Sequence, residues 1–311
     1  MNTALARAAR MQAAHDVLQE GELSAVLAAL ADADIDTLLL KGAALAHSHY
    51  PEPSLRSRCD ADVLIRPADR MIATRILVRL GYQRRNHVSG TLVSYQECFS
   101  KQDGPLHQVI DLHWQINNGQ VFARALAFDE AHARSVPVPN LGASARTLCR
   151  AHALLLACMH RAAHLGADGA YGNRLIWLFD VHLLAGSMGA DEWQQFGDLC
   201  IARAMRRIAL DAFGSTHEAL GTVFPADVTQ RLGGATPVEI SSAYLTAGRA
   251  RLLKTDLRAL ETWRERATLV LEICFPPHDY VLAKYRARHR WQLPLLYFRR
   301  AVGACWKVVR S

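Results

Sequence analysis

Two aspartates stand one residue apart inside the apolar run Cys59-Asp60-Ala61-Asp62-Val63-Leu64-Ile65, and this pair constrains the chain more than any other feature. The run has the composition of a buried strand, in which alternate side chains share a face. Both carboxylates therefore point the same way, with Cα atoms roughly 7 Å apart. Two buried like charges each lose hydration and repel each other. A divalent cation would resolve this conflict, so the pattern predicts a metal site.

The flanking strands bring further candidate site residues. Residues 35–40 read as a buried strand that runs into Lys41-Gly42-Ala43-Ala44, a small-residue turn that opens a helix and could hold phosphate. Residues 109–114 alternate as another strand, which places Asp111 and His113 on one face. A strand, a glycine turn, paired aspartates and a later aspartate form the arrangement that two-metal phosphoryl transfer requires.

The remaining elements follow from hydrophobic periodicity and turn residues. They are two short helices within residues 1–33, a helix over 68–80 that ends at Gly81, a hairpin of strands 91–100 and 106–116 with its turn at 102–105, and a helix over 173–184. From residue 144 the chain is rich in alanine and leucine with helical spacing. The second half is therefore expected to be a helical bundle that closes over the sheet.

Several segments of this sequence resemble the uncharacterised nucleotidyltransferase family of the DNA polymerase β-like superfamily. The resemblance rests on residues 38–45, Tyr50-Pro51, Leu55-Arg56, 60–65, 111–114, His160 with His164, Trp177 with Asp180, and Phe275-Pro276-Pro277. It spans nearly the whole chain. One departure is that the superfamily's Gly-Ser after the first strand is Gly42-Ala43 here, which removes a hydroxyl that can contact a nucleotide phosphate. Phosphate binding would then depend on backbone N–H groups, Lys41 and arginines.

Pattern and resemblance together predict an α+β fold with a small mixed or antiparallel nucleotidyltransferase sheet flanked by helices, followed by an α-helical C-terminal domain. The expected units are an N-terminal helical segment at 1–33, a catalytic domain at 34–143, and a helical domain with a basic tail at 144–311. A chain of 311 residues can hold two domains and bury a substantial core.

Composition favours a cytoplasmic enzyme. Half of the residues are hydrophobic, yet charges interrupt them, and no run approaches the roughly 18 apolar residues of a membrane span. The first ten residues lack the apolar core and cleavage site of a secretory signal. Seven cysteines, an odd number without a close pair, favour reduced thiols over disulfides or a zinc module.

The net charge of +7 belongs to the C-terminal tail. Residues 281–311 contain eight basic residues and no acidic one, which leaves 28 basic against 29 acidic residues in the first 280. One interpretation is contact with an anionic partner such as RNA, an acidic membrane or the nucleotide. The other is a C-terminal helix with a solvated arginine face. Interleaved aromatic and leucine side chains fit packing on the domain or a membrane surface equally well.

Several candidate residues have both a functional and a structural interpretation. Lys41 is either a phosphate contact or a surface lysine, and His113 is either a base near Asp111 or a structural histidine. Arg56 and Arg58 precede the metal strand, where a guanidinium could bind a triphosphate or pair with the aspartates when no metal is bound. The functional interpretation is favoured for Arg56 alone.

His160 and His164 lie four residues apart and would share one helix face. A His-x-x-x-His pair can bind zinc, but the glutamate of His-Glu-x-x-His is absent because position 161 is arginine. Structural or substrate-contacting roles are therefore favoured. Asp180 is expected to pair with one of these histidines and to orient it toward the cleft.

The resulting hypothesis is a metal-dependent nucleotidyltransferase. Asp60 and Asp62 would bind two Mg²⁺ ions, with Mn²⁺ as an alternative, while Asp111 completes one site and helps to deprotonate the attacking hydroxyl. ATP is the default donor, and the acceptor could be a small molecule, a peptide or protein, or an RNA end. Two alternatives remain open: kinase-like transfer of the γ-phosphate, and a non-catalytic binding module that contacts RNA or membrane through the basic tail.

Overall fold

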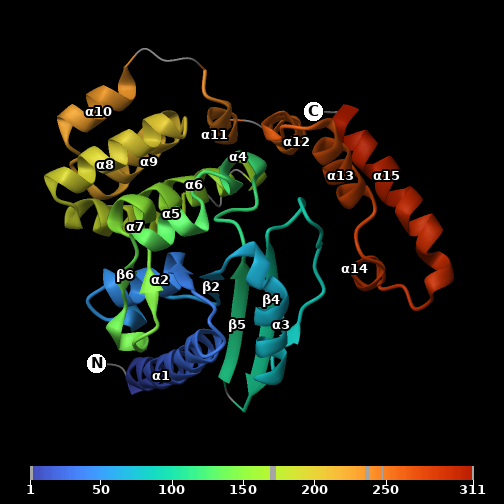
Figure 1. The fold of residues 1–311 in the computed structure, drawn as a ribbon, viewed down its shortest axis with the longest axis horizontal. Helices are drawn as coiled ribbons and strands as arrows, with labels where there is room; N and C mark the ends of the chain where they lie inside the picture. The colour runs from blue at the N-terminus through green and yellow to red at the C-terminus, as the bar shows by residue number, and fades with distance from the viewer. Residues whose placement is uncertain (1–2, 105, 169–172, 235–237, 247, 310–311) are drawn as a thin grey trace.

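One mixed sheet lies at the centre of the computed structural model, which describes residues 3–104, 106–168, 173–234, 238–246 and 248–309 (Figure 1). The sheet has seven strands in the order β3-β4-β5-β2-β1-β7-β6. They are β1 (Leu38–Leu40), β2 (Ala61–Leu64), β3 (Gln83–Arg84), β4 (Gln96–Asp103), β5 (Leu106–His113), β6 (Val136–Pro137) and β7 (Arg146–Thr147). The predicted α+β class is confirmed, and the sheet extends to β7, beyond residue 143.

The central strand β2 pairs antiparallel with β1 and parallel with β5. In this register Asp62 stands beside Leu40 on one neighbour and beside Asp111 on the other. Equivalent positions on adjacent strands present their side chains to the same face of a sheet. The pairing therefore brings the two aspartates together on one face.

Two helices, α1 (Thr3–Ala31) and α3 (Arg70–Arg79), cover the opposite face of the sheet. Leu27 and Leu30 of α1 pack with Leu39 and Val63 in one apolar core. The two short helices predicted for residues 1–33 are in fact this single helix. A glycine inside a helix costs about 1 kcal/mol relative to alanine, but Gly21 does not interrupt α1, because the residues after it are buried against the sheet.

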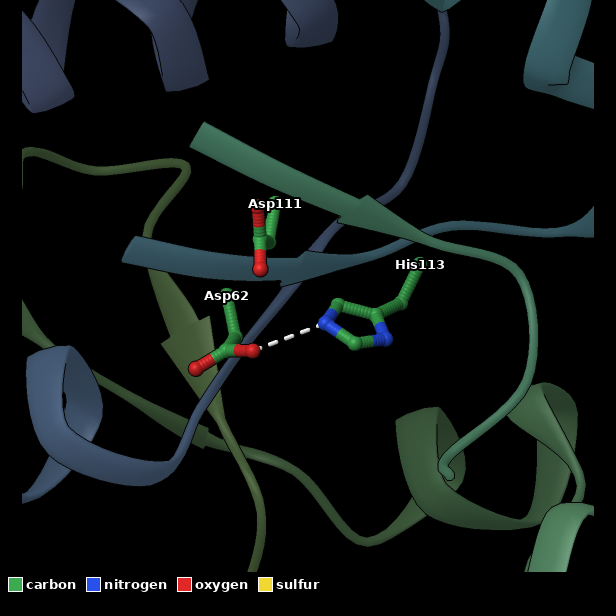
Figure 2. Close-up of side chains that lie close together, drawn as sticks. All are labelled: Asp62, Asp111 and His113. Atoms are coloured by element: carbon green, nitrogen blue, oxygen red, sulfur yellow. Dashed lines mark hydrogen bonds and ion pairs between the residues drawn. The ribbon is translucent and has the colours of Figure 1, made fainter. Parts of the chain in front are cut away.

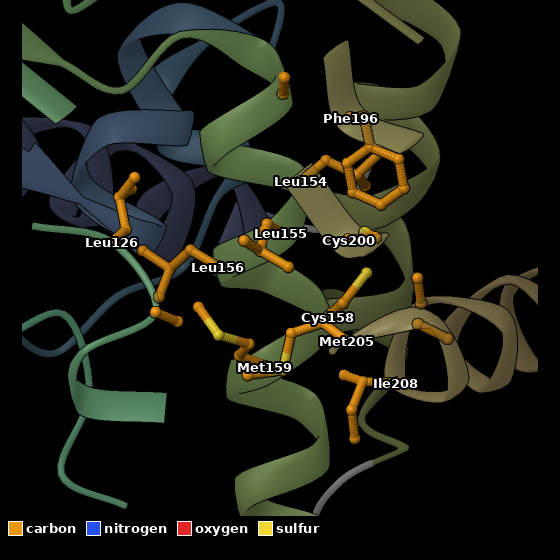
Figure 3. Packing of buried hydrophobic residues seen from close by; sticks show 14 of the residues in the cluster. Leu126, Leu154, Leu155, Leu156, Cys158, Met159, Phe196, Cys200, Met205 and Ile208 are labelled. Carbon is orange, nitrogen blue, oxygen red and sulfur yellow. The ribbon is translucent and has the colours of Figure 1, made fainter. Parts of the chain in front are cut away.

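The face that carries Asp62 points toward the helical half of the chain. Leu38, Leu40 and Leu64, which alternate with the residues of the first core, belong to a second core with α6 to α10. Figure 3 shows part of this core, where Leu154 and Cys158 of α6 lie close to Phe196 and Cys200 of α8. The helices are α6 (Arg150–Asp168), α7 (Leu175–Ser187), α8 (Ala190–Ala202), α9 (Arg206–Leu220) and α10 (Ala226–Gly233).

Short elements connect these layers, and four helices form a C-terminal arm, residues 249–309, beside the sheet (Figure 1). The connecting helices are α2 (Lys41–Ser48), α4 (Gln120–Ala123), α5 (Phe128–Ala133) and α11 (Ala243–Thr246). The 3₁₀ turns are η1 (Pro53–Leu55), η2 (Pro67–Asp69), η3 (Pro139–Leu141), η4 (Ile240–Ser242) and η5 (Arg290–Gln292). The arm consists of α12 (Arg249–Ala259), α13 (Trp263–Cys274), α14 (His278–Lys284) and α15 (Leu293–Val309).

Element boundaries differ from the sequence predictions by a few residues. The predicted helix over 68–80 is η2 followed by α3, and Gly81 ends it with φ of +90°. In the hairpin, the first strand begins at Gln96 rather than at residue 91. The helix predicted over 173–184 is α7. The glycines in the sequence also predict loops at residues 166–172 and 233–237, and parts of both lie outside the described residues. The six cysteines whose side chains are described are free thiols, and no described helix is long and apolar enough to cross a membrane.

Candidate active site

Asp62, Asp111 and His113 form one compact group on the face of the sheet that points toward the helices (Figure 2). One possible ligand atom from each residue lies within 4.8 Å of the others. Asp62 comes from β2, and the other two come from alternate positions of β5. The alternation inferred from the sequence thus places Asp111 and His113 on the observed face.

Asp62 is held by two hydrogen-bond donors. Its Oδ1 accepts a hydrogen bond of 2.6 Å from Lys41 Nζ and lies 2.7 Å from His113 Nε2, while the residue is only 6% exposed. Burial raises the pKa of Asp62, but the Lys41 charge and the His113 hydrogen bond outweigh burial and hold the pKa below its ordinary range. The carboxylate is therefore ionised and fixed in orientation.

Asp60 carries the uncompensated charge of the site. It precedes β2 by one residue and lines the same cleft, but it is not part of the compact group. Burial, followed by the charges of Asp62 and Asp111, raises its pKa to about 6. In Asp111, Oδ2 accepts a hydrogen bond of 2.8 Å from Gln96 Nε2, whereas the buried Oδ1 has no hydrogen-bond partner.

These carboxylates fit a divalent cation. Mg²⁺ prefers carboxylate oxygens, and a buried carboxylate oxygen without a partner is a costly group that a cation would satisfy. His113 Nε2 already faces Asp62 and serves to position it. Asp62, Asp111 and Asp60 are therefore the residues that would hold the metal, and the same carboxylate oxygens also suit Mn²⁺.

The predicted phosphate-binding turn lies directly beside this group. Helix α2 begins at Lys41, whose φ of +50° turns the chain sharply out of β1. Lys41 and Gly42 line the cleft, whereas the side chain of Ala43 packs into the core on the α1 side. A serine hydroxyl at position 43 would point into that core, so only the backbone N–H of Ala43 remains available to a phosphate.

Arg56, which lines the cleft, forms a buried ion pair with Asp180 of α7, and this corrects the expected pairing of Asp180 with a histidine. Arg56 Nε and Nη2 donate to the two carboxylate oxygens of Asp180 at 2.8 and 2.7 Å. Tyr50 Oη also donates to Asp180, at 2.8 Å. A Cβ on Gly42 would lie 3.3 Å from the Arg56 guanidinium, so the glycine permits this close packing.

His160 and His164 instead pack around Trp177 of α7. The two imidazole centroids lie 4.6 and 4.8 Å from the Trp177 ring and 4.5 Å from each other. Burial, Lys41 and His164 hold the pKa of His160 well below its ordinary value, so its imidazole is neutral. Among the described residues these histidines do not belong to a three-residue metal group. They form an aromatic wall of the cleft.

The cleft between the sheet and the helices has a volume of about 800 Å³. Asp60, Asp62 and Asp111 line one side, and His160, His164 and Trp177 line another. Sequence reasoning missed several lining residues that lie outside its motifs, among them Gln96, Asn118, Arg174 and Tyr244. The position of Arg174 three residues before Trp177 is a signal that could have found it, since its guanidinium lies 5.2 Å from the Trp177 ring centroid.

Comparison with known proteins gives a family match. A model of uncharacterised nucleotidyltransferases matches residues 1–221, which include every candidate site residue described above except Tyr244. Among solved structures, the antibiotic-resistance factor ANT(2'')-Ia is 15% identical, with a TM-score of 0.41 over 66% of this chain and 99% of that one. No curated protein matches the chain.

Proposed function

This chain belongs to the family of uncharacterised nucleotidyltransferases, and from this premise we propose that it transfers a nucleoside monophosphate from a nucleoside triphosphate to an acceptor hydroxyl or amine. ATP is the first donor to test. The proposal includes a dependence on Mg²⁺ or Mn²⁺, with pyrophosphate as the second product.

The side-by-side placement of Asp62 and Asp111, with Asp60 at the entrance to β2, carries this proposal. Three carboxylates face one cleft, and two of them lack full compensation by cationic groups: Asp60 has a raised pKa and Asp111 has an unpaired oxygen. A protein that only needed a stable sheet would not gain from such a cluster. Metal-assisted transfer of a charged phosphoryl group uses it directly.

Each neighbouring residue has a role in this reaction. When bound, the metal would neutralise the triphosphate and stabilise the charge that develops during transfer. Lys41 and the N-terminal N–H groups of α2 lie where they can bind phosphate oxygens. Asp111 would hold the metal through Oδ1 and help to deprotonate the attacking group, while Gln96 fixes Oδ2. His113 keeps Asp62 in position.

The aromatic wall supports a binding role for its side of the cleft. The flat surfaces of Trp177 and His164 stack on each other with an angle of 22° between the rings. A neutral His160 adds an apolar edge to this surface. We propose that this wall contacts either the nucleobase or the acceptor, and the acceptor itself is the identity to be found.

The experiment uses ATP labelled at the α- or the γ-phosphate, incubated with the protein, Mg²⁺ and a fractionated cell extract. Transfer of the α-label with release of pyrophosphate supports the proposal, and Asp62→Asn should abolish it. Transfer of the γ-label with formation of ADP would instead show a kinase. Thermal shifts with ATP and Mg²⁺, compared with ATP and EDTA, test binding without an acceptor. Stabilisation that does not depend on metal, with no label transferred, would contradict the proposal.

A further inference from the structure

The C-terminal arm exposes far more apolar surface than its own packing requires. Its helices α13 to α15 lie at the edge of the molecule, away from the bundle of α6 to α10 (Figure 1). Scattered exposed apolar side chains are ordinary, but a cluster of them marks an interaction surface. Eight large apolar side chains of the arm are at least 41% exposed: Trp263, Val270, Leu271, Phe275, Trp291, Leu295, Phe298 and Val302.

One face of α15 accounts for its attachment to the rest of the arm. Leu293 is buried, Tyr297 Oη donates a hydrogen bond of 2.6 Å to the carbonyl of Pro276, and Arg300 Nε donates one of 3.0 Å to the carbonyl of Ile273. These residues recur at helical spacing and face α13 and the turn after it. The inner face of α15 is thus already covered by contacts within the arm.

The opposite face of α15 is an apolar stripe without a described contact. Leu295, Phe298 and Val302 are spaced by three and four residues, so they align along one side of the helix. They are 68%, 68% and 51% exposed, and Trp291 in the preceding turn is 76% exposed. An amphipathic helix normally buries such a stripe, and here it faces away from the arm's interior.

Positive charge is concentrated in the helix that carries this stripe and in the segment before it. Between residues 278 and 303 there are six basic residues and one acidic residue, Asp279, which gives a net charge of +5. Five of the basic side chains are exposed: Lys284, Arg286, Arg288, Arg290 and Arg299. Lys307 and Arg310, also counted in the basic tail, and the aromatic Trp306 lie outside the described side chains.

We propose that the outer face of α15, with the basic segment before it, binds the surface of an anionic lipid membrane. The stripe of Leu295, Phe298 and Val302 would enter the boundary between headgroups and acyl chains, with Trp291 at headgroup level. The basic residues of this segment would pair with anionic headgroups, an attraction that grows with each basic residue near such a surface. This inference does not depend on the proposed nucleotidyl transfer.

The chemistry of the surface argues against other occupants. A second copy of the chain would bring two strongly positive segments together, which like-charge repulsion opposes. Nucleic acid would use the arginines and could stack bases on Trp291 and Phe298, but aliphatic Leu295 and Val302 offer bases no stacking surface and would stay exposed. A membrane uses both the apolar stripe and the positive charge.

Hydrogen bonds attach the arm to the loop before β4. A membrane bound to the arm would therefore lie at a defined position relative to the cleft. The carboxylate of Glu272 in α13 accepts hydrogen bonds from the backbone N–H groups of Thr91, Leu92 and Val93, at 2.6 to 2.9 Å. These residues immediately precede Tyr95 and β4, which contributes Gln96 to the site.

The test is sedimentation of the full-length protein with vesicles of phosphatidylcholine alone or mixed with phosphatidylglycerol. We expect binding to the anionic vesicles only, weakened by salt. Leu295→Ser/Phe298→Ser/Val302→Ser should reduce the affinity by about tenfold or more, and Arg286→Gln/Arg288→Gln/Arg290→Gln should also flatten the salt dependence. The matched control is Val223→Ser/Val238→Ser, which changes two valines that are 85% and 93% exposed elsewhere.

Three results would overturn the proposal. The first is a wild-type protein that does not sediment with anionic vesicles. The second is a triple serine variant that, with an unchanged melting temperature, binds as well as the valine control. The third is use of the stripe for another partner. That partner would be either a second copy of the chain, which gel filtration of wild type and the triple variant would reveal, or RNA that binds in preference to vesicles.

Discussion

Arg56 and Asp180 form a bidentate ion pair between residues 124 positions apart in the sequence. Arg56 lies on the loop that leads into β2, and Asp180 lies on α7, so the pair joins the sheet that carries the aspartates to the helix that carries Trp177. Both side chains are about 7% exposed. The two walls of the cleft are thus held together by a charge pair that is shielded from water.

Breaking this pair should destabilise the protein. Asp180→Asn leaves the buried Arg56 charge uncompensated, and removal of one partner from such a pair costs about 3 kcal/mol or more. The measurement is chemical denaturation at neutral pH. Asp32→Asn, on an exposed turn, is the matched control and should change the free energy of unfolding by no more than about 0.5 kcal/mol. Equal effects of the two variants would contradict a structural role for the pair.

When no metal is present, neutralising Asp60 and neutralising Asp62 should change the stability of the protein in opposite directions. The pKa of Asp60 is raised to about 6, so at pH 7 its charge destabilises the folded state, and Asp60→Asn should stabilise the metal-free protein by about 1 kcal/mol. Asp62→Asn should destabilise it by a similar amount, because Lys41 and His113 lose the negatively charged acceptor that they share.

Melting temperatures in EDTA distinguish these effects, with the wild type as reference. Lowering the pH from 7 toward 6 should stabilise the wild type but not Asp60→Asn. The sequence, which shows only adjacent like charges, predicts that Asp62→Asn leaves the metal-free fold intact or slightly stabilised. The pairing with Lys41 reverses that expectation. Shifts of the same sign in both variants would show that the two aspartates share one environment.

The aspartate cluster was predictable from the sequence because it depends on local periodicity. Alternation along β5 indicated which residues share a face of the sheet with Asp111. The buried apolar strand before Lys41 indicated that this lysine stands at a strand end. Both inferences use contacts within one strand or between a strand and the turn that follows. The family resemblance then supplied the association between β2 and β5, which periodicity alone does not give.

The partner of Asp180 was not predictable in the same way. Periodicity places Asp180 on a helix three residues after Trp177, but it does not say which distant residue enters the space between α7 and the sheet. Arg56 does so because Gly42 leaves room for its guanidinium. The division of charge between Asp60 and Asp62 was also hidden, since it depends on the contact between Lys41, at the end of β1, and Asp62 on the neighbouring β2.

Asp111 and His113 should separate in kinetic experiments once an acceptor is known. Asp111→Ala should lower turnover far more than nucleotide affinity, because Asp60 and Asp62 remain to bind the metal and the nucleotide. His113→Ala should be milder, about 10- to 100-fold, since that residue only positions Asp62. Steady-state kinetics give turnover, and thermal shifts give nucleotide binding. A larger loss of turnover in His113→Ala would assign the proton transfer to the histidine.

Glu272 should make attachment of the C-terminal arm dependent on pH. Burial raises the pKa of Glu272, but the hydrogen bonds from the N–H groups of Thr91, Leu92 and Val93 together lower it by more. The pKa of Glu272 therefore lies below its ordinary value of 4.5. A carboxylate with a lowered pKa in the folded state stabilises the protein above its unfolded pKa, and that contribution is lost as the pH falls through the folded value. Glu272→Gln should therefore be less stable than wild type at pH 7, by about 1 kcal/mol after solvent screening.

The difference between the two proteins should then narrow as the pH falls from about 7 toward 3, because the wild-type carboxyl becomes protonated. Melting temperatures measured across this range provide the test. Glu218→Gln, on the exposed side of α9, is the matched control and should follow the wild type at every pH. A difference between Glu272→Gln and wild type that stayed constant down to pH 3 would show that the shape of this side chain, rather than its charge, holds α13 against the loop before β4.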